Sequence, residues 1–125
     1  MPKEIISTNK APQAIGPYSQ AIKAGSFIFC SGQIPLRIDG TMVEGGIEVQ
    51  TKQVLNNLEE VLKATGAKWK NIVKTTIYLT DLKDFQTVNE IYGKCFKKNP
   101  PARATVQVAA LPKGSKVEID AIAII

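Results

Sequence analysis

Hydrophobic and polar positions along the chain follow two periods, one typical of helices and one typical of strands. Apolar residues recur at helical spacing over residues 48–65, and Gly66 is placed to end that helix. A second helical stripe begins after Asp84, which can cap it, and the prolines at 100 and 101 close that region. β-Branched or alternating segments predict strands at 4–7, 27–33 and 71–80, and two more after residue 100.

Glycine and proline mark the connections between these elements. Residues 9–25 are predicted to form a loop, in which a Gly-Pro pair aims Tyr18 through its backbone. Gly32 lies inside a predicted strand and indicates a bulge or a close backbone approach. Asp39–Gly40 predicts a β-ribbon turning within residues 34–43, and Leu111–Gly114 suits a type I turn between the last two strands.

The element order predicts a single α/β (α+β) domain over residues 1–125. Two helices can cover one face of a mixed sheet built from these strands. The other face would still carry apolar residues, notably Ile122 and Ile124, and no third helix is available to cover it. An apolar face of that size favours self-association.

The last two predicted strands carry charges in small, apolar surroundings. Alternation along a strand places Arg103 on one face with Thr105 and Gln107. By the same rule Glu118 shares a face with Asp120 and the two isoleucines near the C-terminus. A charge in such surroundings needs a partner or a ligand. A structural ion pair between Arg103 and a carboxylate is one interpretation, and a ligand anchor is the other.

The chain contains no histidine, which removes the usual general base and the commonest metal ligand. No cluster of cysteines and carboxylates suits zinc, and no glycine-rich nucleotide motif is present. We therefore expect no metal and no cofactor. Chemistry in this chain would use arginine, carboxylate, hydroxyl and backbone groups together with water.

The net charge of +5 raises the question of nucleic acid, but the lysines are scattered along the sequence without interleaved aromatic residues. Nucleic acid is therefore an unlikely partner. No apolar run is long enough to cross a bilayer and the N-terminal residues form no apolar signal core, so a cytoplasmic location is expected. Cys30 and Cys95 are interpreted as reduced, half-buried thiols.

Several segments carry a family resemblance: IGPYSQAI, FCSGQIP, QVLNNLEEVL, VKTTIYLTDLKDF, VNEIY and PPARATVQVAALPKGSKVEIDAIAI. From about residue 15 to residue 124 the chain resembles the reactive-intermediate deaminase A (RidA, or YjgF) family. The resemblance implies a chorismate-mutase-like fold assembled as a homotrimer, with clefts between subunits. It also implies hydrolysis of reactive 2-imino acids, such as 2-iminopropanoate and 2-iminobutanoate, to 2-keto acids and ammonia.

The same resemblance implies roles for individual residues. Arg103 would hold the substrate carboxylate, and Glu118 would position or activate water. Thr105 would offer its backbone at a position where many members have cysteine. The remaining positions implied to bind substrate are Tyr18, Ser31, Gly32 and Asn89.

Two alternatives to the imine deaminase stay open from the sequence. One is an RNA-directed role as a translation inhibitor or endoribonuclease, since some relatives are described in that way. The other is a non-catalytic module that binds a small molecule in the same cleft.

Overall fold

The structure, a computed structural model, describes residues 2–125. Within them the chain forms six strands and two α-helices, with three short 3₁₀ helices between them. The strands are β1 (Lys3–Ile6), β2 (Ala21–Ala24), β3 (Phe27–Gln33), β4 (Ile72–Leu79), β5 (Ala102–Gln107) and β6 (Val117–Ile124). The helices are α1 (Ile47–Thr65) and α2 (Phe85–Gly93), and the 3₁₀ helices are η1 (Trp69–Asn71), η2 (Leu82–Asp84) and η3 (Pro112–Gly114).

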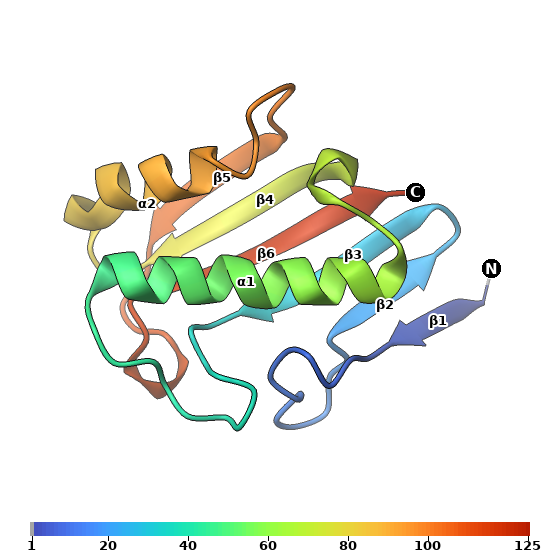
Figure 1. Cartoon of the computed structure of the whole chain (residues 1–125), viewed down its shortest axis with the longest axis horizontal. Helices are drawn as coiled ribbons and strands as arrows, with labels where there is room; N and C mark the ends of the chain where they lie inside the picture. Colours follow the sequence, from blue (N-terminus) through green and yellow to red (C-terminus); the bar gives the residue numbers. More distant parts are fainter. Residues whose placement is uncertain (1) are drawn as a thin grey trace.

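All six strands join one sheet in the order β1-β2-β3-β6-β4-β5. The β4–β5 pair is parallel and the other pairs are antiparallel, so the sheet is mixed as predicted. Both helices lie on the same face of the sheet, with α1 running across its middle (Figure 1). The predicted α+β class, with two helices on one face, is confirmed.

The core lies between this helical layer and the sheet. The apolar stripe predicted on the first helix supplies Val54, Leu58 and Val61, each with no exposed surface. Gly66 ends α1 in the left-handed conformation at φ 85°, as its position predicted, and its N–H bonds to carbonyls of the last turn. β6 lies in the middle of the sheet and is buried at every second residue.

Strand β2 was not predicted, because the sequence suggested a continuous loop over residues 9–25. Ala21–Ala24 is short and sits next to a turn, where Gly25 has φ 62°. It becomes a strand by pairing with β3 and β1 on its two sides. Tertiary pairing therefore decides the structure of a segment whose own pattern is weak.

The predicted β-ribbon over residues 34–43 forms in a shortened version, with its turn at Asp39–Gly40. Leu36 and Met42 form one bridge pair. The N–H of Arg37 bonds to the carbonyl of Thr41 (2.8 Å), and the N–H of Val43 bonds to the carbonyl of Pro35 (3.0 Å). The buried side chain of Asn57 donates to the carbonyls of Ile34 (3.1 Å) and Leu36 (2.9 Å), so helix α1 holds one strand of the ribbon in place.

Three further expectations need correction. Asp84 does not cap α2 with its side chain; Asp81 instead accepts from the N–H of Lys83 at 2.9 Å and opens η2, which leads directly into α2. The last two strands follow each other along the chain but are not neighbours, because β4 lies between β5 and β6. Their connection contains η3, in which Lys113 has φ 57° where the predicted type I turn requires a negative φ.

The sheet face opposite the helices is apolar and uncovered, as predicted. Its exposed large residues are 40–64% accessible and come from four strands: Ile5, Phe27, Phe29, Val106 and Ile124. The rings of Phe27 and Phe29 stack on each other, with centroids 6.2 Å apart. Within residues 2–125, neither helix combines the length and the apolar character that a membrane crossing requires.

We predict that Asn57→Ala lowers the free energy of unfolding by about 1–3 kcal/mol, because it leaves the buried carbonyl of Leu36 without a donor, whereas the carbonyl of Ile34 keeps the N–H of Leu36 at 2.7 Å. Urea denaturation at neutral pH would measure the change. Asn56→Ala is the matched control: Asn56 is exposed on the same helix, and its loss should change stability by no more than about 0.5 kcal/mol. Equal effects of the two variants would contradict the anchoring role of Asn57.

Candidate functional site

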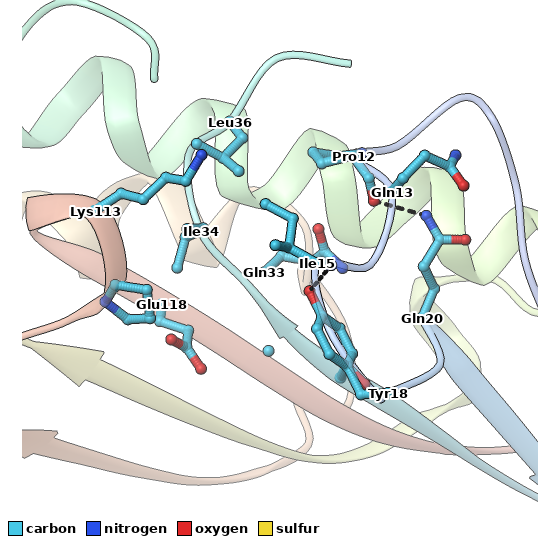
Figure 2. A pocket seen from close by; sticks show the side chains of 13 residues that line it. Pro12, Gln13, Ile15, Tyr18, Gln20, Gln33, Ile34, Leu36, Lys113 and Glu118 are labelled. Atoms are coloured by element: carbon cyan, nitrogen blue, oxygen red, sulfur yellow. Dashed lines mark hydrogen bonds between the residues drawn. The ribbon is translucent and has the colours of Figure 1, made fainter. Parts of the chain in front are cut away.

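A cleft of about 480 Å³ opens where β3 and β6 meet the N-terminal loop, and we call it the Glu118 cleft. Figure 2 shows Glu118 and Lys113 on one side of it and Tyr18 on the other. The structure brings four of the predicted site residues together here: Tyr18, Ser31, Gly32 and Glu118. Apolar residues supply much of the remaining wall: Pro12, Ile15, Ile34, Leu36 and Pro112.

Glu118 lies directly against the backbone of Gly32. A Cβ placed on Gly32 would be 2.8 Å from Cδ of Glu118 and would collide with its carboxylate oxygen. Only glycine therefore leaves room for the carboxylate in its present position. The close backbone approach that the sequence indicated for this glycine is confirmed, and its partner is the predicted catalytic carboxylate.

The surroundings of Glu118 increase the proton affinity of its carboxylate. Partial burial raises the pKa of this carboxyl above its ordinary value, and the negative charge of Asp120 on the same face raises it further. Asp120 in turn accepts a hydrogen bond of 3.1 Å from the hydroxyl of Tyr78, the residue opposite Glu118 on β4. A carboxylate with a raised pKa is a stronger base than a free one.

Local hydrogen bonds fix the rest of the cleft. The Tyr18 N–H donates to the carbonyl of Gly16 (2.9 Å), and the Tyr18 hydroxyl accepts from the N–H of Ile15 at 3.3 Å. The Ser31 hydroxyl donates to the carbonyl of Ser19 at 2.5 Å. Because its proton is used in this way, Ser31 presents oxygen lone pairs toward a ligand.

Two buried amides that sequence analysis did not single out hold the segments around this cleft. Gln20 is 3% exposed; it donates to the carbonyls of Thr8 (3.1 Å) and Pro12 (2.8 Å) and accepts from the N–H of Thr8 at 2.7 Å. Asn57 fixes residues 34–36. A polar residue on the otherwise apolar stripe of α1 was a signal that could have identified Asn57, whereas Gln20 lies in a loop without a pattern.

Arg103 and Asn89 lie elsewhere, in a second hollow lined by α2 and the residues before β5, which we call the Arg103 hollow. Nη1 of Arg103 donates to Oδ1 of Asn89 at 2.5 Å. The guanidinium carbon lies 5.5 Å from the ring centre of Phe85 and 5.2 Å from that of Tyr92. Amide and aromatic faces thus hold this cation in place.

Within residues 2–125, Arg103 forms no structural ion pair with a carboxylate of its own chain. The ion pairs among residues 2–125 are Lys52 with Glu48 and Lys63 with Glu60, and neither involves Arg103. The guanidinium is also exposed. Its remaining N–H groups are therefore free to bind a carboxylate from outside the chain.

Arg103 and Glu118 point to opposite faces of the sheet. Arg103 pairs with the fully buried Thr75 and lies under α2, on the helical side. Glu118 alternates with the buried Val117 and Ile119, so it points to the uncovered side. Strand β4 also separates β5 from β6. One chain by itself does not bring these two residues together.

Thr105 lies two residues beyond Arg103 on the helical face, where its hydroxyl is buried without a hydrogen-bond partner among residues 2–125. It lines neither the Glu118 cleft nor the Arg103 hollow. The two cysteines are free thiols; burial raises the pKa of Cys30 to about 12 and that of Cys95 to about 11, so both favour the unreactive protonated form. The described residues contain no group of three side chains placed to hold a metal ion.

Comparison with known proteins supports one family throughout. The sequence profile of the family described as endoribonuclease L-PSP matches residues 8–125. The chain is 55% identical over 123 residues to 2-iminobutanoate/2-iminopropanoate deaminase of Homo sapiens, covering 98% of this chain and 90% of that protein. It is 57% identical over 122 residues to Reactive Intermediate Deaminase A, chloroplastic, of Arabidopsis thaliana, covering 97% of this chain and 65% of that protein.

A solved structure agrees with these sequence relatives. The crystal structure of Escherichia coli TdcF with bound serine matches with a TM-score of 0.92 and 42% identity, covering 98% of each chain. The fold, the sequence motifs and the near-complete coverage all indicate the same family. The chain therefore belongs to the endoribonuclease L-PSP family, the reactive-intermediate deaminase family that its motifs resemble.

Proposed function

We propose that this protein hydrolyses small 2-imino acids, such as 2-iminopropanoate and 2-iminobutanoate, to 2-keto acids and ammonia. The observation that carries the proposal is the guanidinium of Arg103, which is held by Asn89 and two rings without a carboxylate partner in its own chain. It suits the carboxylate that every 2-imino acid carries. The names of the Homo sapiens and Arabidopsis thaliana relatives support the same reaction.

The complete site requires two copies of the chain, because Arg103 and Glu118 lie on opposite faces of one sheet. We infer a homotrimer of chorismate-mutase-like subunits, in which neighbouring copies cover the uncovered apolar face. One subunit would contribute Arg103, Asn89 and the backbone of Thr105. Its neighbour would contribute the Glu118 cleft, with Tyr18, Ser31 and Gly32.

The reaction in this site needs only water and the side chains named. Arg103 binds the substrate carboxylate and thereby places the iminium carbon near Glu118. Glu118 takes a proton from water as the oxygen attacks that carbon, then returns the proton to the amino nitrogen. The C–N bond breaks, and the hydroxyl proton leaves with ammonia as ammonium. The raised pKa of Glu118 suits both proton transfers.

We also propose the cytoplasmic location that the sequence predicts.

The first prediction is that Arg103→Ala lowers kcat/KM for 2-iminopropanoate about 100-fold or more, because the substrate loses a charge-assisted, two-point contact. Freshly generated 2-iminopropanoate is hydrolysed with semicarbazide present, which traps the surviving imine. Arg37→Ala is the matched control, since Arg37 is exposed and bonds only residues of its own turn. Full activity of Arg103→Ala would refute the anchor role, and wild-type rates equal to buffer would refute the deaminase itself.

The second prediction concerns the shared site. Arg103→Ala and Glu118→Gln should each be inactive, but unfolding and reassembling them together should restore roughly a quarter of wild-type activity, because mixed assemblies contain some clefts with both native residues. Mixing Glu118→Gln with Glu118→Ala is the control, and every cleft there lacks the carboxylate. If the first mixture recovers nothing while the mixed assembly forms, both residues act from the same subunit.

The third prediction is that Gly32→Ala folds but loses most activity, because the added methyl group displaces the Glu118 carboxylate. The side chain of Glu118 can rotate away, so circular dichroism and assembly should stay unchanged. Combining Gly32→Ala with Glu118→Asp, which shortens the side chain, should recover part of kcat. Gly46→Ala is the control, since a Cβ there meets no atom within 4 Å. A fully active Gly32→Ala would show that this contact does not position the carboxylate.

A further inference from the structure

The Glu118 cleft contains a cation that the hydrolysis proposed above does not use. Lys113 lines the cleft and is exposed, and neither ion pair among residues 2–125 involves it. Within the same residues its ammonium group donates only to the carbonyl of Gly40, at a distance of 3.4 Å, which is long for a hydrogen bond. An ammonium group has three donors, so at least two remain available to a ligand.

The backbone of Lys113 is strained, and its side chain is directed away from the base. Its φ of 57° lies in the left-handed region, which costs a residue other than glycine about 1–3 kcal/mol. Because the side chain is exposed, burial does not offset this cost. Figure 2 shows the ammonium end of Lys113 pointing toward the side of the cleft that Leu36 lines, whereas the Glu118 carboxylate points the other way. The cation and the base therefore face different parts of a bound substrate.

Gln33 supplies a second, independent feature of the same cleft. Its side chain is only 6% exposed and lines the cleft, yet its amide forms no hydrogen bond with residues 2–125. The amide is not among the fully enclosed polar atoms without a partner, which are Oε2 of Glu60 and Oγ1 of Thr105, so its remaining surface opens into the cleft. The other buried amide of the lining, Gln20, is fully paired. A buried amide without a partner is costly, and a ligand would satisfy it.

The cleft is larger than the smallest 2-imino acids need. Its volume of about 480 Å³ lies in the range that accommodates drug-sized ligands, whereas the side chain of 2-iminopropanoate is a single methyl group. Ile34 and Leu36 contribute an apolar wall that suits the methylene groups of a longer side chain. Beyond that wall, the donors of Lys113 suit a negatively charged end group.

We propose that the protein hydrolyses 2-imino acids whose side chain ends in a second carboxylate, and that Lys113 and Gln33 bind this group. The inference rests on the proposed deaminase function and specifies its substrate class. A carboxylate accepts hydrogen bonds from an ammonium and an amide N–H together, whereas an apolar side chain leaves both donors unpaired. The second carboxylate takes no part in the chemistry. Water adds to the iminium carbon and the C–N bond breaks as before, which gives a 2-keto dicarboxylate and ammonium.

Substrates of matched shape provide the test. 2-Iminosuccinate and 4-methyl-2-iminopentanoate are generated from aspartate and leucine by amino acid oxidases with catalase present, and semicarbazide traps the surviving imine. Their side chains differ at the end, where carboxylate oxygens replace methyl groups. We expect kcat/KM of the wild type to be about tenfold higher or more for 2-iminosuccinate, the value of one charge-assisted hydrogen bond. In a parallel arm with 2-iminoglutarate, a preference for this substrate alone also supports the class and identifies the longer side chain.

The decisive measurement is the ratio of kcat/KM for the preferred acidic substrate to kcat/KM for 4-methyl-2-iminopentanoate. Lys113→Met keeps the length of the side chain without its charge and should lower this ratio about tenfold. Gln33→Met should lower it about threefold, through the loss of an uncharged donor. Lys116→Met is the matched control and should leave the ratio unchanged, because Lys116 is exposed in the same connection but does not line the cleft.

Three results would overturn the proposal: an unchanged ratio in Lys113→Met, an equal fall in Lys116→Met, or a wild-type preference for 4-methyl-2-iminopentanoate over both acidic substrates. Hydrolysis of 2-iminopropanoate by the wild type is measured in parallel. Its absence would refute the deaminase function itself, whereas its presence together with any of the three results would refute only the acidic substrate class.

Discussion

The alternation of side chains along β6 is the constraint on which the rest of the structure depends. Its inward residues, Val117, Ile119, Ala121 and Ala123, are at most 2% exposed and complete the core beneath α1. Its outward residues include the catalytic candidate Glu118, the neighbouring Asp120 and the apolar positions of the uncovered face. One strand therefore supports folding on one side and both chemistry and association on the other. A shift of one residue in its pairing would exchange these roles.

Association and catalysis are consequently difficult to separate in this protein. Arg103 is positioned by α2 on the helical face, and Glu118 is positioned by Gly32 on the opposite face. Neither face of the sheet carries both the proposed carboxylate anchor, Arg103, and the proposed base, Glu118. In the trimer that we propose, a second copy would supply the missing residues by docking its helical edge beside the uncovered face, which would give the apolar residues there a functional as well as a stabilising role.

Strong periodic patterns allowed much of the fold to be predicted from the sequence. The stripe of α1, its glycine stop and the alternation in β5 and β6 are local properties, and the structure has them. The features that were missed depend on distant partners: β2 forms by pairing on both sides, and Asn57 of α1 anchors residues 34–36, which lie far from it along the chain. In the candidate site, too, local patterns could be predicted from the sequence and contacts between distant residues could not. Alternation placed Arg103 and Glu118 on their faces, but only the strand order showed that β4 separates them, and no sequence spacing predicted that Gln33 and Lys113 would line the same cleft.

The contact between Glu118 and Gly32 has a consequence for how the protein responds to ionic strength. The carboxylate occupies the space that a side chain at residue 32 would fill, and no cation pairs with it among residues 2–125. Dissolved salt does not weaken such a contact, whereas it screens the attraction between the exposed Arg103 and a substrate carboxylate. Rising ionic strength should therefore increase KM while kcat changes little. Capture of the substrate and its chemistry would then respond separately to the composition of the surrounding solution.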